Sequence, residues 1–133
     1  MRNPVRAFAA RFITELPRLA AQGLPVYHAW AFGNLRQLGA ASELSALYLR
    51  WLQAEPVATA AASPGAKTSL APAVQAYLQI AQGCKALVLK AARAVSTRRA
   101  LDAGAQLEEL AAAWERATAL LRTEAAERAS AAA

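Results

Sequence analysis

A chain of 133 residues with a net charge of +6 at pH 7 has room for one domain rather than two. Its single cysteine and single histidine exclude an internal disulfide and a structural zinc site. No apolar run reaches the length of about 18 residues that a membrane span needs, and no signal-peptide pattern opens the chain. We therefore expect a cytoplasmic protein without a membrane span, metal or cofactor.

Alanine dominates the apolar content, with 38 of the 133 residues. Alanine favours helix but buries little surface, so the composition predicts an all-α protein whose core depends on few large side chains. The large side chains that we expect in the core are Phe8, Phe12, Ile13, Leu16, Leu19, Trp30, Phe32, Leu35, Leu38, Leu44, Leu47, Trp51, Tyr77, Leu78, Leu87, Val88, Leu107, Leu110, Trp114 and Leu121.

The first predicted helix begins after Asn3, a favourable N-cap, with Pro4 in the first helical position, where its missing N–H costs nothing. Apolar residues then recur at spacings of three and four, as on one face of an amphipathic helix. Pro17 interrupts this face, so we expect it to kink the helix or to start a second short piece that ends near Gln22 and Gly23.

The second predicted helix follows Gly23 and ends before Pro56, because a residue that precedes proline is pushed out of the helical region. Two glycines, Gly33 and Gly39, lie within it. Glycine inside a helix costs about 1 kcal/mol relative to alanine, so these two indicate either a close contact between helices or a break. We expect a bend at Gly33 or Gly39, or a split near Gly39.

The whole chain is predicted to form one helical domain. Residues 1–55 hold a first helical pair, residues 56–69 a flexible connection, and residues 70–128 a second pair separated by a turn at 102–104. Residues 129–133 are expected to fray. Four long helices joined in this way predict an all-α, antiparallel helical bundle.

Catalytic chemistry is not predicted for this chain alone. Cys84 and His28 lie on different predicted helices with nothing to orient either one, and a free cysteine in a helical stripe is usually a small core residue. The glutamates belong to an ordinary charged helix face. The stretch from Gly33 to Gly39 lacks the Gly-Lys-Ser/Thr ending and the preceding strand of a phosphate-binding loop.

The candidate binding residues of the second helix lie in the stretch 24–52, which gathers four of the six tyrosines and tryptophans and the only histidine. Tyr27 and Trp30 share one side with Gln37, and two interpretations remain: burial with a satisfied polar tip, which we favour, or ligand contact. The same two interpretations apply to His28. Arg36 is the strongest functional candidate, because a guanidinium beside aromatics is costly to bury unless it is paired.

Charge is unevenly distributed between the last two helices. Residues 69–100 carry +5 and residues 102–128 carry −3. The basic helix is a candidate docking face for an acidic partner, with Lys85, Lys90 and Arg93 as its binding residues. Nucleic-acid binding is not favoured, because no known binding motif accompanies the charge and the neighbouring acidic helix partly neutralises it.

A set of motifs resembles a bacterial family, the domain of unknown function 1839. The residues that carry the resemblance are Asn3-Pro-Val, Phe12, Leu16-Pro17, Gly23-Leu24, Tyr27-His-Ala-Trp-Ala-Phe32, Leu35-Arg-Gln-Leu-Gly39, Glu43-Leu44, Leu49-Arg-Trp-Leu52, Lys85, Lys90-Ala-Ala-Arg93 and Leu107 to Trp114. The resemblance covers most of this chain but only the C-terminal part of a usual family member.

The N-terminal part of full family members is similar to the papain-like acyltransferase of butirosin biosynthesis, which moves an aminoacyl group from a carrier protein to an amine. This chain has no counterpart of that part or of its nucleophile. The resemblance therefore implies a non-catalytic helical module that supports transfer or processing of carrier-protein-bound aminoacyl groups. The partners that it implies are an acidic carrier protein or a catalytic domain of this papain-like kind.

Two alternatives stay open. One is a structural or oligomerisation domain, with a second copy of the chain as its partner. The other is a truncated fragment without independent activity.

Overall fold

The computed structural model describes residues 1–54 and 69–133. Its elements, in order, are α1 (Pro4–Gln22), α2 (Leu24–Tyr27), the π-helical segment η1 (His28–Phe32), α3 (Gly33–Ala54), α5 (Ala71–Thr97) and α6 (Gly104–Ala132). The segments α2, η1 and α3 follow one another without a loop, so the described residues form four helical arms and the predicted all-α bundle is confirmed. The predicted connection 56–69 lies outside the described residues except for Ser69. Among the described residues, no helix is long and apolar enough to cross a membrane.

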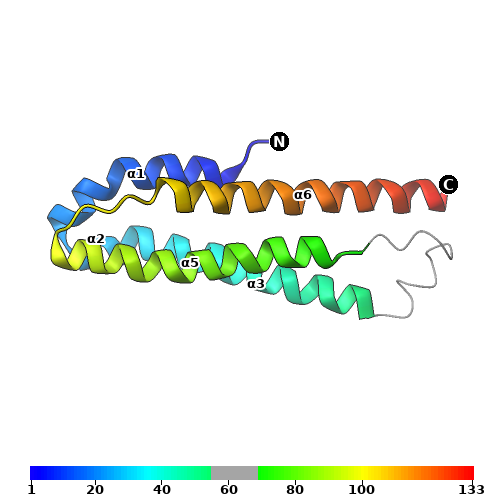
Figure 1. Ribbon diagram of the computed structural model, residues 1–133, viewed down its shortest axis with the longest axis horizontal. Helices are drawn as coiled ribbons and strands as arrows, with labels where there is room; N and C mark the ends of the chain where they lie inside the picture. The colour runs from blue at the N-terminus through cyan, green and yellow to red at the C-terminus, as the bar shows by residue number, and fades with distance from the viewer. Residues whose placement is uncertain (55–68) are drawn as a thin grey trace.

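The four arms run up and down along one axis (Figure 1). The most extensive packing joins α3 to α5, and α6 packs against both α5 and α1. Figure 1 shows that α1 lies beside only part of α6 and that the N-terminus lies midway along it. The remaining length of the bundle is therefore built from α3, α5 and α6.

The start of α1 follows the predicted cap. Asn3 Oδ1 accepts hydrogen bonds from the backbone N–H groups of Val5, at 3.0 Å, and Arg6, at 3.2 Å. Pro17 lies inside α1, which continues as one helix to Gln22, so a separate second piece is not formed. Because Pro17 is exposed, water can replace the hydrogen bond that its missing N–H would have donated.

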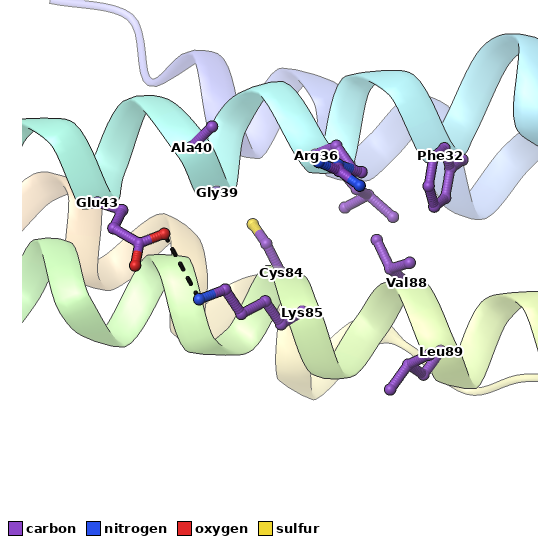
Figure 2. A pocket seen from close by; sticks show the side chains of 10 residues that line it. Phe32, Arg36, Gly39, Ala40, Glu43, Cys84, Lys85, Val88 and Leu89 are labelled. Carbon is purple, nitrogen blue, oxygen red and sulfur yellow. Dashed lines mark ion pairs between the residues drawn. The ribbon is translucent and has the colours of Figure 1, made fainter.

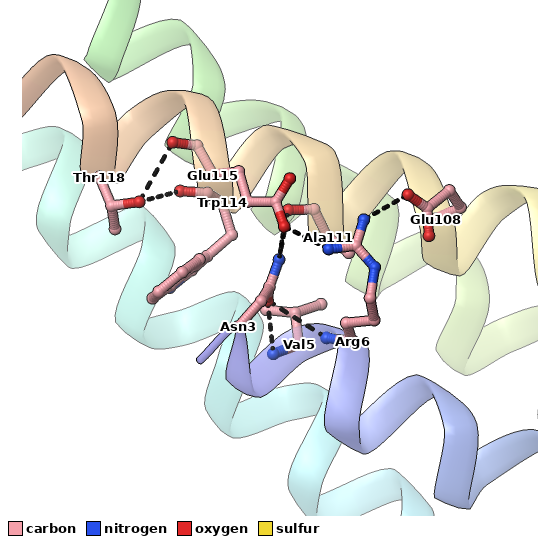
Figure 3. Close-up of polar contacts among 8 residues, drawn as sticks. All are labelled: Asn3, Val5, Arg6, Glu108, Ala111, Trp114, Glu115 and Thr118. Atoms are coloured by element: carbon pink, nitrogen blue, oxygen red, sulfur yellow. Dashed lines mark hydrogen bonds and ion pairs between the residues drawn. The ribbon is translucent and has the colours of Figure 1, made fainter. Parts of the chain in front are cut away.

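A polar joint fixes the beginning of α1 to α6 (Figure 3). Asn3 Nδ2 donates to the carbonyl of Ala111 and to Glu115 Oε1, each at 2.9 Å. The Arg6 guanidinium forms ion pairs with Glu108 and Glu115, so this arginine of α1 is tied to α6. Both ion pairs are exposed, and their contribution to stability is correspondingly small.

The irregularity of the second arm lies at His28–Phe32, directly before Gly33, and not near Gly39. The segment His28–Phe32 is π-helical, whereas α3 runs without interruption past Gly39. Gly39 instead allows a close helix contact, because a Cβ atom there would lie 3.1 Å from Cys84 Cβ on α5. The alternative of close contact between helices is therefore the correct interpretation of this glycine.

The ends of α5 and α6 are set locally. Arg98, at the C-cap of α5, adopts the left-handed conformation with φ of 52°. Asp102 Oδ1 accepts a hydrogen bond of 3.2 Å from the N–H of Gly104, where α6 begins, as the predicted turn requires. The helix then continues to Ala132, so residues 129–132, expected to fray, are helical.

Three clusters of buried residues form the core along the bundle. The fully buried large side chains are Tyr27, Phe12, Leu19, Leu35, Ile80, Leu87, Leu107 and Leu110. Most of them belong to the cluster that joins α1, α2, α3, α5 and α6. The core is therefore widest at the end of the bundle where α1 is present.

Four of the side chains predicted to be in the core are exposed. Leu44 is 68% exposed, Leu47 55%, Trp51 54% and Ile13 46%. The buried residues of α3 are Leu35, Gly39, Ser42, Ala46 and Leu49. At 100° per residue, Leu44, Leu47 and Trp51 lie on the opposite side of the helix from these, and no described element covers that side. A helix with apolar residues on two sides cannot be oriented from its sequence alone.

Candidate functional site

An open groove lies between η1 and α3 on one side and α5 on the other (Figure 2). Its volume is about 480 Å³. The residues that line it are Phe32, Leu35, Arg36, Gly39, Ala40, Glu43, Cys84, Lys85, Val88 and Leu89. Most of these residues expose apolar atoms to the groove, so its walls are apolar, with three charged side chains among them.

The floor of the groove is formed where Gly39 of α3 packs closely against Cys84 of α5. Cys84 is 1% exposed, and burial raises the pKa of its thiol to about 11. Burial therefore favours the protonated thiol, which is the less reactive form. His28, the only histidine of the chain, is exposed and lies against Phe32, with ring centroids 5.1 Å apart.

The charges at the groove are predominantly positive. Arg36 is exposed, and its guanidinium carbon lies 5.7 Å from the centroid of the Phe32 ring, within the range of a cation–π contact. Among the described residues, Arg36 has no carboxylate partner. Lys85 Nζ lies 3.5 Å from Glu43 Oε2, and both side chains are exposed. The groove thus holds two cations and one carboxylate, which leaves Arg36 available for an anion.

The helices that form the groove lie within a known protein family. Residues 1–123 match the model of the family described as the DUF1839 C-terminal domain. The chain belongs to this family. The matched residues include η1, α3 and α5, so both walls of the groove lie within the family domain. No match was found among curated proteins or among solved structures.

In this DUF1839 C-terminal domain, the side chains of Tyr27 and Trp30 pack in or against the hydrophobic core. Tyr27 is fully buried, its hydroxyl donates a 2.8 Å hydrogen bond to the carbonyl of Val88, and burial raises its pKa to about 12. The favoured interpretation, a buried ring with a satisfied polar tip, is the one the structure shows for Tyr27. Trp30 is half-buried and stacks on Phe8 and Phe12 of α1, with centroid distances of 6.1 Å and 6.5 Å.

The π-helical segment contributes the aromatic side chain that lines the groove. Tyr27, Ala31 and Leu35 are buried at successive spacings of four. Phe32 lines the groove, whereas His28 does not. π-Helical turns are rare and recur at functional sites. Arg36 follows Phe32 by four residues, so its guanidinium lies over the Phe32 ring as (i, i+4) neighbours of a helix do.

The other candidate residues lie outside the groove. Gln37, Lys90 and Arg93 are exposed and do not line it. Arg93 follows Lys85 and Leu89 at intervals of four residues, so these three share one side of α5 and extend the positive charge beyond the groove. Of the predicted binding residues, the structure therefore brings Arg36 and Lys85 together.

Sequence reasoning missed four residues of the groove that define its shape and charge: Phe32, Gly39, Glu43 and Leu89. One signal was available, because Glu43 lies seven residues after Arg36 and so on the same side of α3. The contribution of Leu89 depends on how α5 is rotated against α3, which no local pattern states. Among the described residues, no group of three metal-ligating side chains is present.

Proposed function

We propose that this chain is a non-catalytic helical module that supports the transfer or processing of carrier-protein-bound aminoacyl groups together with a papain-like acyltransferase domain. Membership of the DUF1839 C-terminal domain family supports the proposal. The observation that carries it is the apolar groove between α3 and α5, with Arg36 at its edge and no carboxylate partner for that guanidinium in residues 1–54 and 69–133.

The groove suits the chemistry of such a ligand. A carrier protein presents its acyl group on a long flexible arm that is attached through a phosphodiester, next to acidic helices. The apolar walls match the carbon-rich arm, and Arg36 and Lys85 offer cations for the phosphodiester. Lys90 and Arg93, further along α5, extend the positive surface on which acidic helices would dock.

The proposed role requires no chemistry from this chain. Cys84, its only cysteine, is buried and its raised pKa keeps the thiol protonated. The nucleophile would belong to the catalytic domain, and the helical module would bind and orient the carrier-borne group. Positioning of this kind raises the rate of acyl transfer without a catalytic residue in the module.

Titration with an acidic acyl-carrier protein, once loaded with an amino acid and once unloaded, tests the proposal by calorimetry at low and high salt. We expect binding that weakens at least about tenfold as the salt concentration rises, because charged contacts steer the association. We expect Arg36→Glu to weaken binding about tenfold or more at low salt. The loaded carrier should bind more tightly than the unloaded one.

Arg122→Glu is the matched control, because Arg122 is an exposed arginine on α6 and its reversal changes the net charge equally. It should leave carrier binding nearly unchanged. Absence of binding at low salt, or equal losses from Arg36→Glu and Arg122→Glu, would count against the groove as the site.

A structural or oligomerisation role is the second candidate. It is favoured by the exposed apolar residues Leu44, Leu47, Tyr48 and Trp51 of α3, which the groove does not use.

A further inference from the structure

The outward side of α3 carries a continuous apolar surface, here called the α3 stripe: Leu44, Leu47, Tyr48 and Trp51. These side chains are 68%, 55%, 56% and 54% exposed, respectively. Tyr48 and Trp51 stack on each other, with ring centroids 5.8 Å apart and planes inclined by 24°. Spacings of three, one and three place all four on one side of the helix, opposite the side that packs on α5.

The size of the α3 stripe exceeds what scattered surface residues produce. Large aromatic side chains present about 150–250 Å² each, so the exposed parts of the four side chains sum to about 400–500 Å². The largest apolar patch of a monomer is typically about 300–600 Å² and often functional. Two such stripes facing each other, with their charged edges, would bury about 1,000–1,200 Å² in total, at the lower limit of specific interfaces.

A row of charges along one edge of the stripe identifies the orientation of a partner helix. Arg36, Glu43 and Arg50 recur at intervals of seven, so they line the same edge. In an antiparallel helix pair, equivalent edges of the two helices face each other. A twofold axis between Leu44 and Leu47 then places Glu43 of each copy opposite Arg50 of the other copy.

The same arrangement also brings apolar side chains of the two copies together. Leu44 packs on Leu47 of the second copy, and Trp51 lies over Ala40 of the second copy, which is exposed in the single chain. Arg50 has no ion-pair partner among the described residues. Glu43 forms an exposed ion pair with Lys85, whose Nζ lies 3.5 Å from Oε2. Arg50 is therefore available for the second copy, and Glu43 can accept a second cation because a carboxylate has two acceptor oxygens.

We propose that the chain forms a symmetric dimer in which α3 packs antiparallel against α3 of a second copy, through the α3 stripe and two Glu43–Arg50 ion pairs. The interface is isologous and closes as a dimer. Because its area is small, association is in the micromolar range. The groove between α3 and α5 lies beside the interface, since Arg36, Ala40 and Glu43 line the groove as well.

Sedimentation equilibrium of the full chain tests the dimer with a charge-reversal cycle. Glu43→Arg and Arg50→Glu should each raise the dissociation constant about tenfold, because each creates two repulsive contacts. The double variant Glu43→Arg/Arg50→Glu restores opposite charges and should return to within about threefold of the unmodified chain. Leu47→Asp should raise the constant at least about a hundredfold.

Ile13→Asp is the control, because Ile13 is an apolar residue of α1 that is 46% exposed and lies outside the stripe. It should leave the dissociation constant unchanged, and circular dichroism establishes that each variant retains its helices. The proposal is overturned if the unmodified chain is monomeric up to about 300 µM. It is also overturned if the double charge reversal is as weak as the single ones, which would assign the stripe to a partner other than a second copy.

Discussion

Gly83 of α5 and Leu110 of α6 offer a sharp test of how closely this alanine-rich bundle is packed. A Cβ atom at Gly83 would lie 2.3 Å from Leu110 Cδ2 and 3.4 Å from Leu110 Cγ. Leu110 is only 2% exposed, so its side chain must rotate within a filled core. Gly83→Ala therefore introduces overpacking that costs about 1–3 kcal/mol.

The substitution also has a favourable effect, because alanine is about 1 kcal/mol better than glycine inside a helix. We expect a net loss of about 0–2 kcal/mol in the free energy of unfolding for Gly83→Ala. Gly33 is the matched control, because it is also helical and a Cβ atom there meets nothing within 4 Å. Gly33→Ala should stabilise the chain by up to about 1 kcal/mol.

A double-mutant cycle separates the two effects in urea denaturation monitored by circular dichroism. Leu110→Ala alone should cost about 2–5 kcal/mol, and it removes the atoms that the methyl group added by Gly83→Ala would strike. The double variant should then be more stable than the sum of the single effects predicts, by about 1–3 kcal/mol. If Gly83→Ala stabilises as much as Gly33→Ala, or if the cycle is additive, the close contact is not limiting.

Three further predictions concern the polar contacts. Asn3→Ala should lower the free energy of unfolding by about 1–3 kcal/mol, measured with urea, because both the cap of α1 and its bonds to α6 are lost. The hydrogen bond from Asn3 and the ion pair with Arg6 lower the pKa of Glu115 below its ordinary value, so stability is lost as the pH falls below about 4.5. Glu115→Gln should reduce this loss of stability at acid pH. Burial raises the pKa of Tyr27 to about 12. As the pH rises above about 10, the tyrosine ionises first in the unfolded chain, so the folded state loses stability. Tyr27→Phe should reduce this loss in melting temperatures measured as a function of pH.

The positions of the helices could be predicted from short stretches of the sequence. Asn3 and Pro4 predicted the start of α1, and the turn at 102–104 predicted the start of α6, because caps and turns depend on a few neighbouring residues. Pro17 was harder to interpret, since its effect depends on which side of the helix it occupies. The π-helical turn at His28–Phe32 was not predicted from the sequence.

The candidate site was only partly accessible from the sequence. Arg36 and Lys85 were predicted as binding residues, and the structure places both at one groove. Their partners Phe32 and Glu43 were missed, because a groove is a property of two helices and of the angle at which they are rotated against each other. Gly39, for which a break was one of two interpretations, instead lies in close contact with Cys84 of α5.

Composition and periodicity by themselves determined that this protein is an all-helical, basic bundle of four arms, because helix propensity, caps and turns act over a few residues. Tertiary structure alone decided which side of α3 is buried. Leu44, Leu47 and Trp51 are as apolar as Leu35 and Leu49, yet α5 packs on the side that contains the small residues Gly39, Ser42 and Ala46. Small residues let two helices approach closely, and that contact leaves the larger side chains facing outward.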